Sequence, residues 1–93
     1  MPNHFYTVLC DYAGGTYVSQ FEGSHAEDVA RQWAAMISSQ RPIPRNSAFI
    51  AKRVVRDLEI GLTPTALLGL THVWQTNGWV GQSSYSATIV RTS

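Results

Sequence analysis

Apolar residues recur at helical spacing only in the middle of this sequence, and strand-like runs flank that middle on both sides. Residues 5–12, 16–22, 72–80 and 85–92 are rich in β-branched and aromatic residues, which favour strands. The expected order is therefore strand, strand, helix, helix, strand, strand. Helices placed between two hairpins usually pack on one face of an antiparallel sheet. The sequence predicts an α+β fold: a two-layer sandwich with a four-stranded antiparallel sheet and two helices on one face.

The first two strands are expected to form a hairpin, because Ala13-Gly14-Gly15 separates them. A Gly-Gly pair can supply the positive φ that a tight turn requires. Alternation along the first strand gives two faces that both carry apolar side chains, so the sequence does not decide which face is the core. One face carries Tyr6, Val8 and Cys10, and the other carries Phe5, Thr7 and Leu9.

The turn of the last hairpin has two alternative positions in the sequence, Asn77-Gly78 and residues 81–84. Residues 62–71 show no clear period and are interpreted as a loop. Trp74 and Trp79 are five positions apart, so in an unbroken strand their side chains point to opposite faces. At least one of the two tryptophans is then expected on the face away from the helices.

The first helix is predicted to begin near Ser24, which has Glu27 three residues later in the spacing of a capping box. Apolar residues follow at one helical stripe: Ala26, Val29, Ala30, Trp33 and Ile37. Residues 38–44 end this helix, because Pro42 and Pro44 each disfavour helical geometry in the residue before them.

The second helix is predicted over residues 48–60, with Asn46 or Ser47 as its cap and Gly61 as its stop. Its apolar stripe comprises Ile50, Ala51, Val54, Val55 and Leu58. Phe49, Lys52, Arg53 and Arg56 fall on the opposite side at spacings of three and four.

A chain of 93 residues has room for one hydrophobic core, so residues 1–93 are expected to form a single domain. No apolar run approaches the roughly 18 residues that a membrane span needs. The first residues lack the basic region and the apolar stretch of a secretory signal, and Cys10 is the only cysteine. These features predict a cytoplasmic protein with no membrane partner.

The sequence shows no constellation that predicts catalysis, a metal or a cofactor. His4, His25, His72 and Cys10 have no paired ligand spacing, and Cys10 in mid-strand is expected to pack as a small core residue. The neighbouring carboxylates, Glu27 with Asp28 and Asp57 with Glu59, are explained by a helix start and a solvated helix end. We therefore expect a protein that is not an enzyme.

Two features point instead to recognition of a macromolecule. Five of the seven basic residues lie within residues 41–56, a stretch without any acid: Arg41, Arg45, Lys52, Arg53 and Arg56. Aromatic residues are crowded near the end of the chain, at Trp74, Trp79 and Tyr85. The sequence predicts a partner-binding surface with Trp79 and Tyr85 as apolar anchors and Arg53 and Arg56 as charged rim.

Residues 6–12, 14–20 and 26–33, with the ending at 69–74 and 87–92, resemble small bacterial proteins of largely unassigned function. Some such proteins resemble immunity factors encoded beside secreted toxins. The first third is also similar to HicB-type antitoxins, which share an opening strand, a Gly-Gly-x-Tyr hairpin and a following helix. That family continues with a DNA-binding segment, whereas this chain ends in a predicted hairpin.

The resemblance implies a stoichiometric binding protein, an immunity or antitoxin-type inhibitor that neutralises a bacterial toxin. The alternative from the residues themselves is a small nucleic-acid-binding protein that uses the basic residues 41–56 against phosphates. A protein partner, here a toxin, is the preferred expectation, and no residue pattern indicates an oligomeric state.

Overall fold

The computed structural model describes residues 3–92 of the chain. Along the chain, two strands are followed by two helices and then by three more strands. The strands are β1 (His4–Tyr12), β2 (Gly15–Gly23), β3 (Thr65–Ala66), β4 (Val73–Val80) and β5 (Ser83–Arg91). The helices are α1 (Ala26–Gln40) and α2 (Ser47–Glu59).

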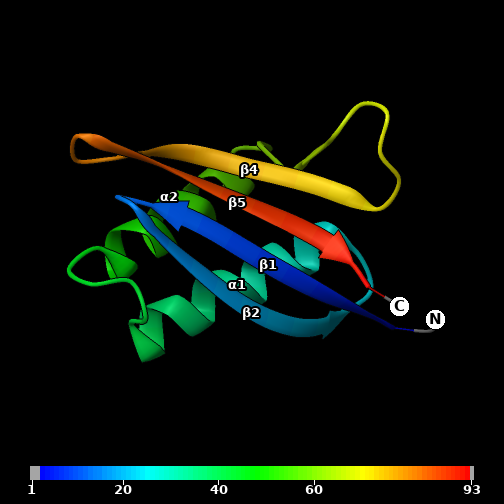
Figure 1. Ribbon diagram of the computed structural model, residues 1–93, viewed down its shortest axis with the longest axis horizontal. Coiled ribbons are helices and arrows are strands. Elements are labelled where there is room, and N and C mark those ends of the chain that lie inside the picture. The colour runs from blue at the N-terminus through cyan, green and yellow to red at the C-terminus, as the bar shows by residue number, and fades with distance from the viewer. Residues whose placement is uncertain (1–2, 93) are drawn as a thin grey trace.

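The sheet has the order β2-β1-β5-β4-β3, and all of its neighbouring strands are antiparallel. Both helices lie against one face of it, as Figure 1 shows. The α+β class and the two helices agree with the prediction, but the expected four strands are wrong, because the sheet has five. The additional strand β3 pairs with Gln75 and Trp74 of β4 in a segment predicted as loop. Two residues are too few to leave a period in the sequence.

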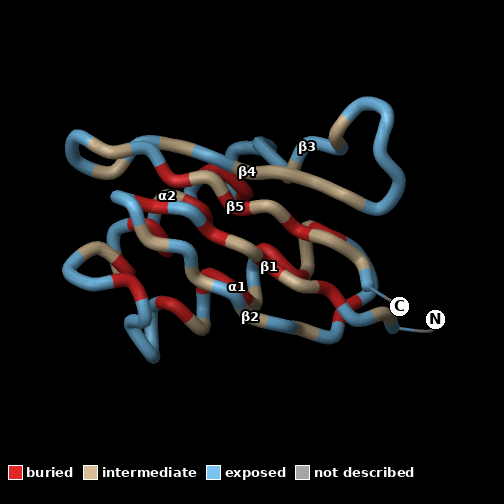
Figure 2. The backbone as a smooth tube through the Cα atoms, in the orientation of Figure 1, coloured by how far each residue is buried: buried red, intermediate tan, exposed pale blue. Residues whose placement is uncertain are grey.

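The helix-covered face of the sheet is the one that carries Tyr6, Val8 and Cys10, and all three side chains are buried. Buried and less buried residues alternate along β1 and β5, as Figure 2 shows. From the helices, Trp33 and Val54 enter the same buried cluster, as their stripes predicted. The opposite face, called here the open face, carries the alternate side chains of the same strands.

Both hairpins have two-residue turns. In the first, the positive φ angles belong to Ala13 (48°) and Gly14 (83°), so the expectation of a Gly-Gly turn is shifted by one residue. In the second, Gly81 and Gln82 form the turn, and Gly78 lies inside β4 opposite Tyr85. The Asn77-Gly78 alternative is therefore wrong, because Gly78 leaves room for the Tyr85 ring, which would lie 3.1 Å from an added Cβ.

Helix α1 begins one residue later than the capping box predicted. His25 is the N-cap, and its Nδ1 accepts a hydrogen bond from the backbone N–H of Asp28 at 3.2 Å. The carboxylate of Asp28 in turn accepts a hydrogen bond from the backbone N–H of Ser24 at 3.2 Å. His25 and Asp28 thus take the places expected of Ser24 and Glu27, but the carboxylate bonds to the N–H of the residue before the N-cap and not to that of the N-cap itself.

Helix α2 begins at Ser47 and ends at Glu59, within one residue of the predicted bounds. Asn46 is its N-cap but makes no side-chain bond to the helix. Ser47 is buried, and its hydroxyl accepts a hydrogen bond from the N–H of Ile43 and donates one to the Ile43 carbonyl, both at 2.8 Å. Val55, predicted on the buried stripe, is 38% exposed. It lies at the margin of the stripe, in the hollow between α1 and α2, and not between α2 and the sheet.

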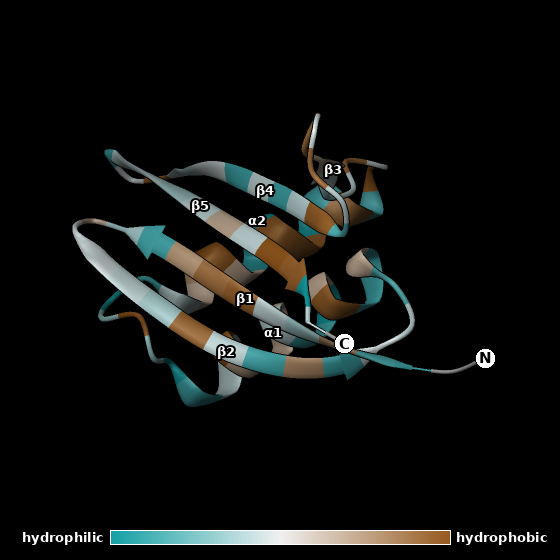
Figure 3. Ribbon diagram, turned by 45° about the vertical axis from the view of Figure 1, so that its right-hand side comes forward, coloured by the Kyte–Doolittle hydropathy of each residue, from teal (hydrophilic) through white to brown (hydrophobic). Residues whose placement is uncertain are grey.

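The most hydrophobic stretches of the sheet are in β1 and β5, its central strands, as Figure 3 shows. Central strands are covered on both sides by neighbours, which is where apolar residues gain most from burial. Within residues 3–92, neither helix has the length and apolar character needed to cross a membrane.

Candidate partner-binding surface

Tyr85, one of the two predicted anchors, is not on the surface. Its side chain is fully buried in the cluster between sheet and helices. The paired residues Gly78 and Tyr85 face the helices, and the absence of a side chain at Gly78 leaves room for the Tyr85 ring beside β4. Tyr85 therefore belongs to the core, and its assignment as an exposed anchor is corrected.

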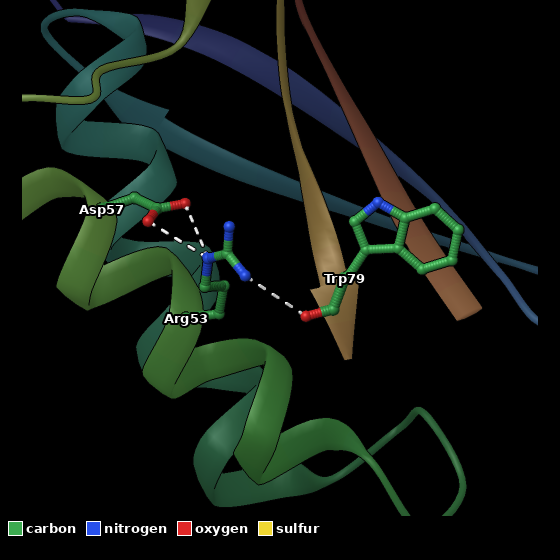
Figure 4. Close-up of polar contacts among 3 residues, drawn as sticks. All are labelled: Arg53, Asp57 and Trp79. Atoms are coloured by element: carbon green, nitrogen blue, oxygen red, sulfur yellow. Dashed lines mark hydrogen bonds and ion pairs between the residues drawn. The ribbon is translucent and has the colours of Figure 1, made fainter. Parts of the chain in front are cut away.

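Trp79, the other predicted anchor, is exposed to 63%. It lies near the end of β4 on the open face, whereas Trp74 packs against the core and its ring lies 6.0 Å from that of Tyr6. The two tryptophans thus face opposite sides, as their spacing of five predicted. Figure 4 shows the indole of Trp79 directed away from Arg53, while the Trp79 carbonyl oxygen is directed toward it.

Arg53 joins α2 to the end of β4. Its Nε donates to both carboxylate oxygens of Asp57, at 3.2 and 3.3 Å, and its Nη1 donates to the Trp79 carbonyl at 3.3 Å (Figure 4). Asp57 is buried, so its charge needs this partner. Arg53 is half-buried and its charge is neutralised by Asp57. Its bonds hold α2 against the end of β4, so its role is structural and it is not a free charge for a partner.

The charges that remain available beside Trp79 belong to Lys52 and Arg56, which are both exposed and make no ion pair with the described residues. Phe49, one turn before Arg53, is 59% exposed. These three side chains and the end of β4 surround a shallow hollow of about 310 Å³. We name Phe49, Lys52, Arg56 and Trp79 the α2/β4 surface.

The sequence predicted two members of this surface, Arg56 and Trp79, as binding residues and did not include Phe49 and Lys52. The helical period already placed Phe49 on the side of α2 opposite its apolar stripe. An aromatic residue at such a position is the signal that could have identified it.

A second and larger hollow of about 400 Å³ lies between the outer sides of α1 and α2. Alanines of both helices form its floor, and Arg31, Lys52 and Arg56 lie at its rim. Arg31 is paired with Glu27 at 3.1 Å, so Lys52 and Arg56 are the unpaired cations here as well. The two hollows share these two residues, and the exposed Glu59 at the end of α2 is the acid of this helix that lines the larger hollow.

The groups that could carry chemistry are held in their neutral forms or are distant from one another. Burial raises the pKa of the Cys10 thiol to about 12, and the nearby Asp11 carboxylate acts in the same direction. Burial likewise raises the pKa of Tyr85 to about 12, with a further contribution from Asp57. Among residues 3–92, no group of three His, Cys, Asp or Glu side chains could hold a metal ion.

A comparison of the chain with protein-family models, with curated proteins and with solved structures found no significant match. The geometry of the chain's own surface is therefore the basis for proposing a function.

Proposed function

We propose that this chain is a non-enzymatic binding protein that recognises another protein through the α2/β4 surface. The observation that carries the proposal is the exposure of two large aromatic side chains, Phe49 and Trp79, beside two cations that have no ion-pair partner among the described residues. Aromatic residues and arginine are the side chains most enriched at the centres of protein interfaces.

The charge of this surface defines the partner. Lys52 and Arg56 are exposed, and α2 carries two acids: Asp57, which is engaged by Arg53, and the exposed Glu59 at the end of the helix, which does not line the hollow beside Trp79. A partner with an acidic surface would be attracted over distances of about 8 to 10 Å at ordinary salt, which raises the association rate. The expected partner is therefore a protein with an acidic patch next to an apolar one.

Within this class, we propose an immunity or antitoxin-type inhibitor, which binds a bacterial toxin and covers its active surface. The resemblance of residues 6–12, 14–20 and 26–33 and of the C-terminal segments to small bacterial proteins, some of which resemble immunity factors, supports this assignment. Such an inhibitor needs a stable complex and no chemistry of its own. Stoichiometric binding then accounts for its action completely.

A second candidate, binding of nucleic acid, is favoured by one observation. Arg41 and Arg45 in the loop between the helices are exposed, as are Lys52 and Arg56 on α2, so four cations lie on the helical side of the molecule. Phosphate binding uses such cations without regard to the aromatic residues beside them.

The test is capture of the partner from the native host by tagged wild-type protein and by two double variants of equal charge. One carries Lys52→Gln and Arg56→Gln, and the control carries Arg41→Gln and Arg45→Gln. We expect the first double variant to lose the captured protein and the control to retain it. Nucleic-acid binding predicts a different result, in which both variants weaken by similar factors and lose a similar part of the salt dependence.

A further inference from the structure

The outer edge of β4 is covered by another strand over only part of its length. β3 pairs with Trp74 and Gln75, and the N–H of Leu67 donates to the Val73 carbonyl at 3.0 Å. From residue 76 to residue 80, β4 has no strand neighbour on this side within the described chain. An uncovered edge is a template for a further strand.

The register shows which backbone groups of this edge point outward. Gly78 and Val80 pair with Tyr85 and Ser83 around the two-residue turn, so their backbone groups point toward β5. The carbonyl of Trp79 points outward, because it accepts the hydrogen bond from Arg53. Alternation then directs the N–H and C=O of Asn77, and the N–H of Trp79, away from the sheet.

Basic residues lie along the helix side of this edge. A hollow of about 380 Å³ is lined by Asp57, Thr63, Thr76 and Asn77, among others, and it shares Arg53 with the hollow of the α2/β4 surface. The two hollows together follow the uncovered edge from the end of β3 to Phe49. Lys52 and Arg56 line the hollow at the Phe49 end and give that end of the path a positive charge, while Asp57 in the other hollow is bonded to Arg53.

We propose that the outer edge of β4 binds an extended segment of the partner protein as an added strand, and that this segment alternates acidic and apolar residues. In a strand, successive side chains point to opposite faces. One set of side chains would then meet Lys52 and Arg56 on the helix side, and the other set would lie on the open face beside Trp79. This inference rests on the proposed function and specifies how aromatic and basic residues on two sides of β4 contact one segment.

The other sheet edge, β2, does not fit the same segment. Its outward groups belong to residues such as Val18 and Gln20, and one outward carbonyl on each edge already accepts a side-chain bond: Glu22 from Gln32 Nε2 at 2.8 Å on β2, and Trp79 from Arg53 on β4. The charged side chain on the open face of this edge is Glu22, which would repel an acidic strand. The β2 edge therefore provides the matched control.

The experiment uses the full chain and a blocked hexapeptide of alternating glutamate and valine, with NMR chemical shifts as the readout. The test variant is Asn77→Pro, which removes an outward N–H, and its control is Asn77→Ala, which keeps it. Proline is tolerated at edge positions whose N–H faces solvent. We expect Asn77→Pro to bind about tenfold more weakly than Asn77→Ala, and Gln20→Pro on the β2 edge to bind like wild type.

Three outcomes would overturn the inference: no binding of the peptide to wild-type protein, equal binding by Asn77→Pro and Asn77→Ala, or a loss in Gln20→Pro instead. Equal binding of a lysine-valine peptide would overturn its acidic part. If circular dichroism shows that Asn77→Pro does not fold, a glutamate-valine peptide with alternate N-methylated amides replaces it. This peptide lacks the N–H donors of an added strand, so its binding to wild-type protein should be weaker than that of the unmethylated peptide. If Lys52→Gln with Arg56→Gln loses the captured partner while Asn77→Pro retains it, the α2/β4 surface stands and the added strand fails.

Discussion

Tyr12 and Tyr85 are paired across β1 and β5, but their hydroxyl groups differ in environment. The hydroxyl of Tyr12 donates to the Val80 carbonyl at 2.9 Å. The hydroxyl of Tyr85 is buried and has no hydrogen-bond partner among the described residues. A buried polar group without a partner costs free energy that a bonded one recovers. The two tyrosines thus form a matched pair for measuring that cost.

We expect Tyr85→Phe to raise the free energy of unfolding by about 1 kcal/mol, because it removes a desolvated hydroxyl that bonds to nothing. Tyr12→Phe is the control and should lower it by about 1 kcal/mol, because it removes the hydrogen bond from the Tyr12 hydroxyl to the Val80 carbonyl. Urea denaturation of both variants measures the two changes. Destabilisation of similar size in both would show that Tyr85 has a partner.

The raised pKa values of Cys10 and Tyr85 predict a loss of stability in alkali. The pKa of Cys10 is raised from 9.0 to about 12 and that of Tyr85 from 10.0 to about 12, mainly by burial. Above pH 9 to 10 the unfolded chain therefore releases protons that the folded protein retains, so stability is lost as the pH rises toward 12. We expect the fall in unfolding free energy over this range to be shallower in Tyr85→Phe than in wild type. Parallel curves would contradict the burial of an ionisable Tyr85.

At the scale of elements, the hairpin between β1 and β2 carries a residue of unfavourable conformation. Ala13 has a φ of 48° next to Gly14 at 83°. Left-handed geometry is costly for alanine, whereas Asn-Gly is a preferred pair for a turn of this kind. The turn with Ala13-Gly14 is therefore less stable than the same turn would be with Asn-Gly.

We expect Ala13→Asn to stabilise the protein by about 0.5 to 1 kcal/mol, which corresponds to a rise in Tm of about 2 to 8 °C for a domain of this size. Ala13→Val is the control, since a β-branched residue tolerates positive φ poorly and should lower the Tm. Thermal denaturation followed by circular dichroism measures both. A lower Tm in Ala13→Asn would show that Ala13 is not held in this conformation in solution.

The elements that the sequence predicted are those with a repeated period. The stripe through Trp33 and the stripe through Val54 located both helices, and the four long strands lie within two residues of their predicted bounds. β3 has no period to detect, and it forms because β4 offers it an edge. The sequence pattern assigned the N-cap of α1 to Ser24, but the imidazole nitrogen of His25 accepts the capping bond instead. Histidine is not among the residues by which an N-cap is usually recognised in a sequence.

At the scale of the whole molecule, the candidate binding surface was only partly predictable. The spacing of Trp74 and Trp79 placed them on opposite faces, and the exposure of Trp79 follows from the helices covering only one face. Tyr85 could not be assigned in the same way, because its burial depends on the register that places it opposite Gly78. That register is a tertiary property that no local pattern carries.

The proposed function also predicts what the molecule does not bind. Arg53 is neutralised by Asp57, and the four exposed cations Arg41, Arg45, Lys52 and Arg56 are spread along the helix pair and its loop. We expect no binding to short duplexes of unrelated DNA sequence in a fluorescence titration at low salt. Tight binding that falls steeply with added salt and is equal for unrelated sequences would favour nucleic acid as the partner.

The central claim is that Trp79 is an anchor of a protein interface, and its most direct test is calorimetric titration of the captured partner with wild-type and Trp79→Ala protein. Val18→Ala is the control, because Val18 is an exposed apolar residue of the opposite edge strand β2. An anchor at the centre of an interface loses about 2 kcal/mol or more on truncation, so we expect Kd to rise about thirtyfold in Trp79→Ala and to stay unchanged in Val18→Ala. A folded Trp79→Ala variant that binds with the Kd of wild type would contradict the account.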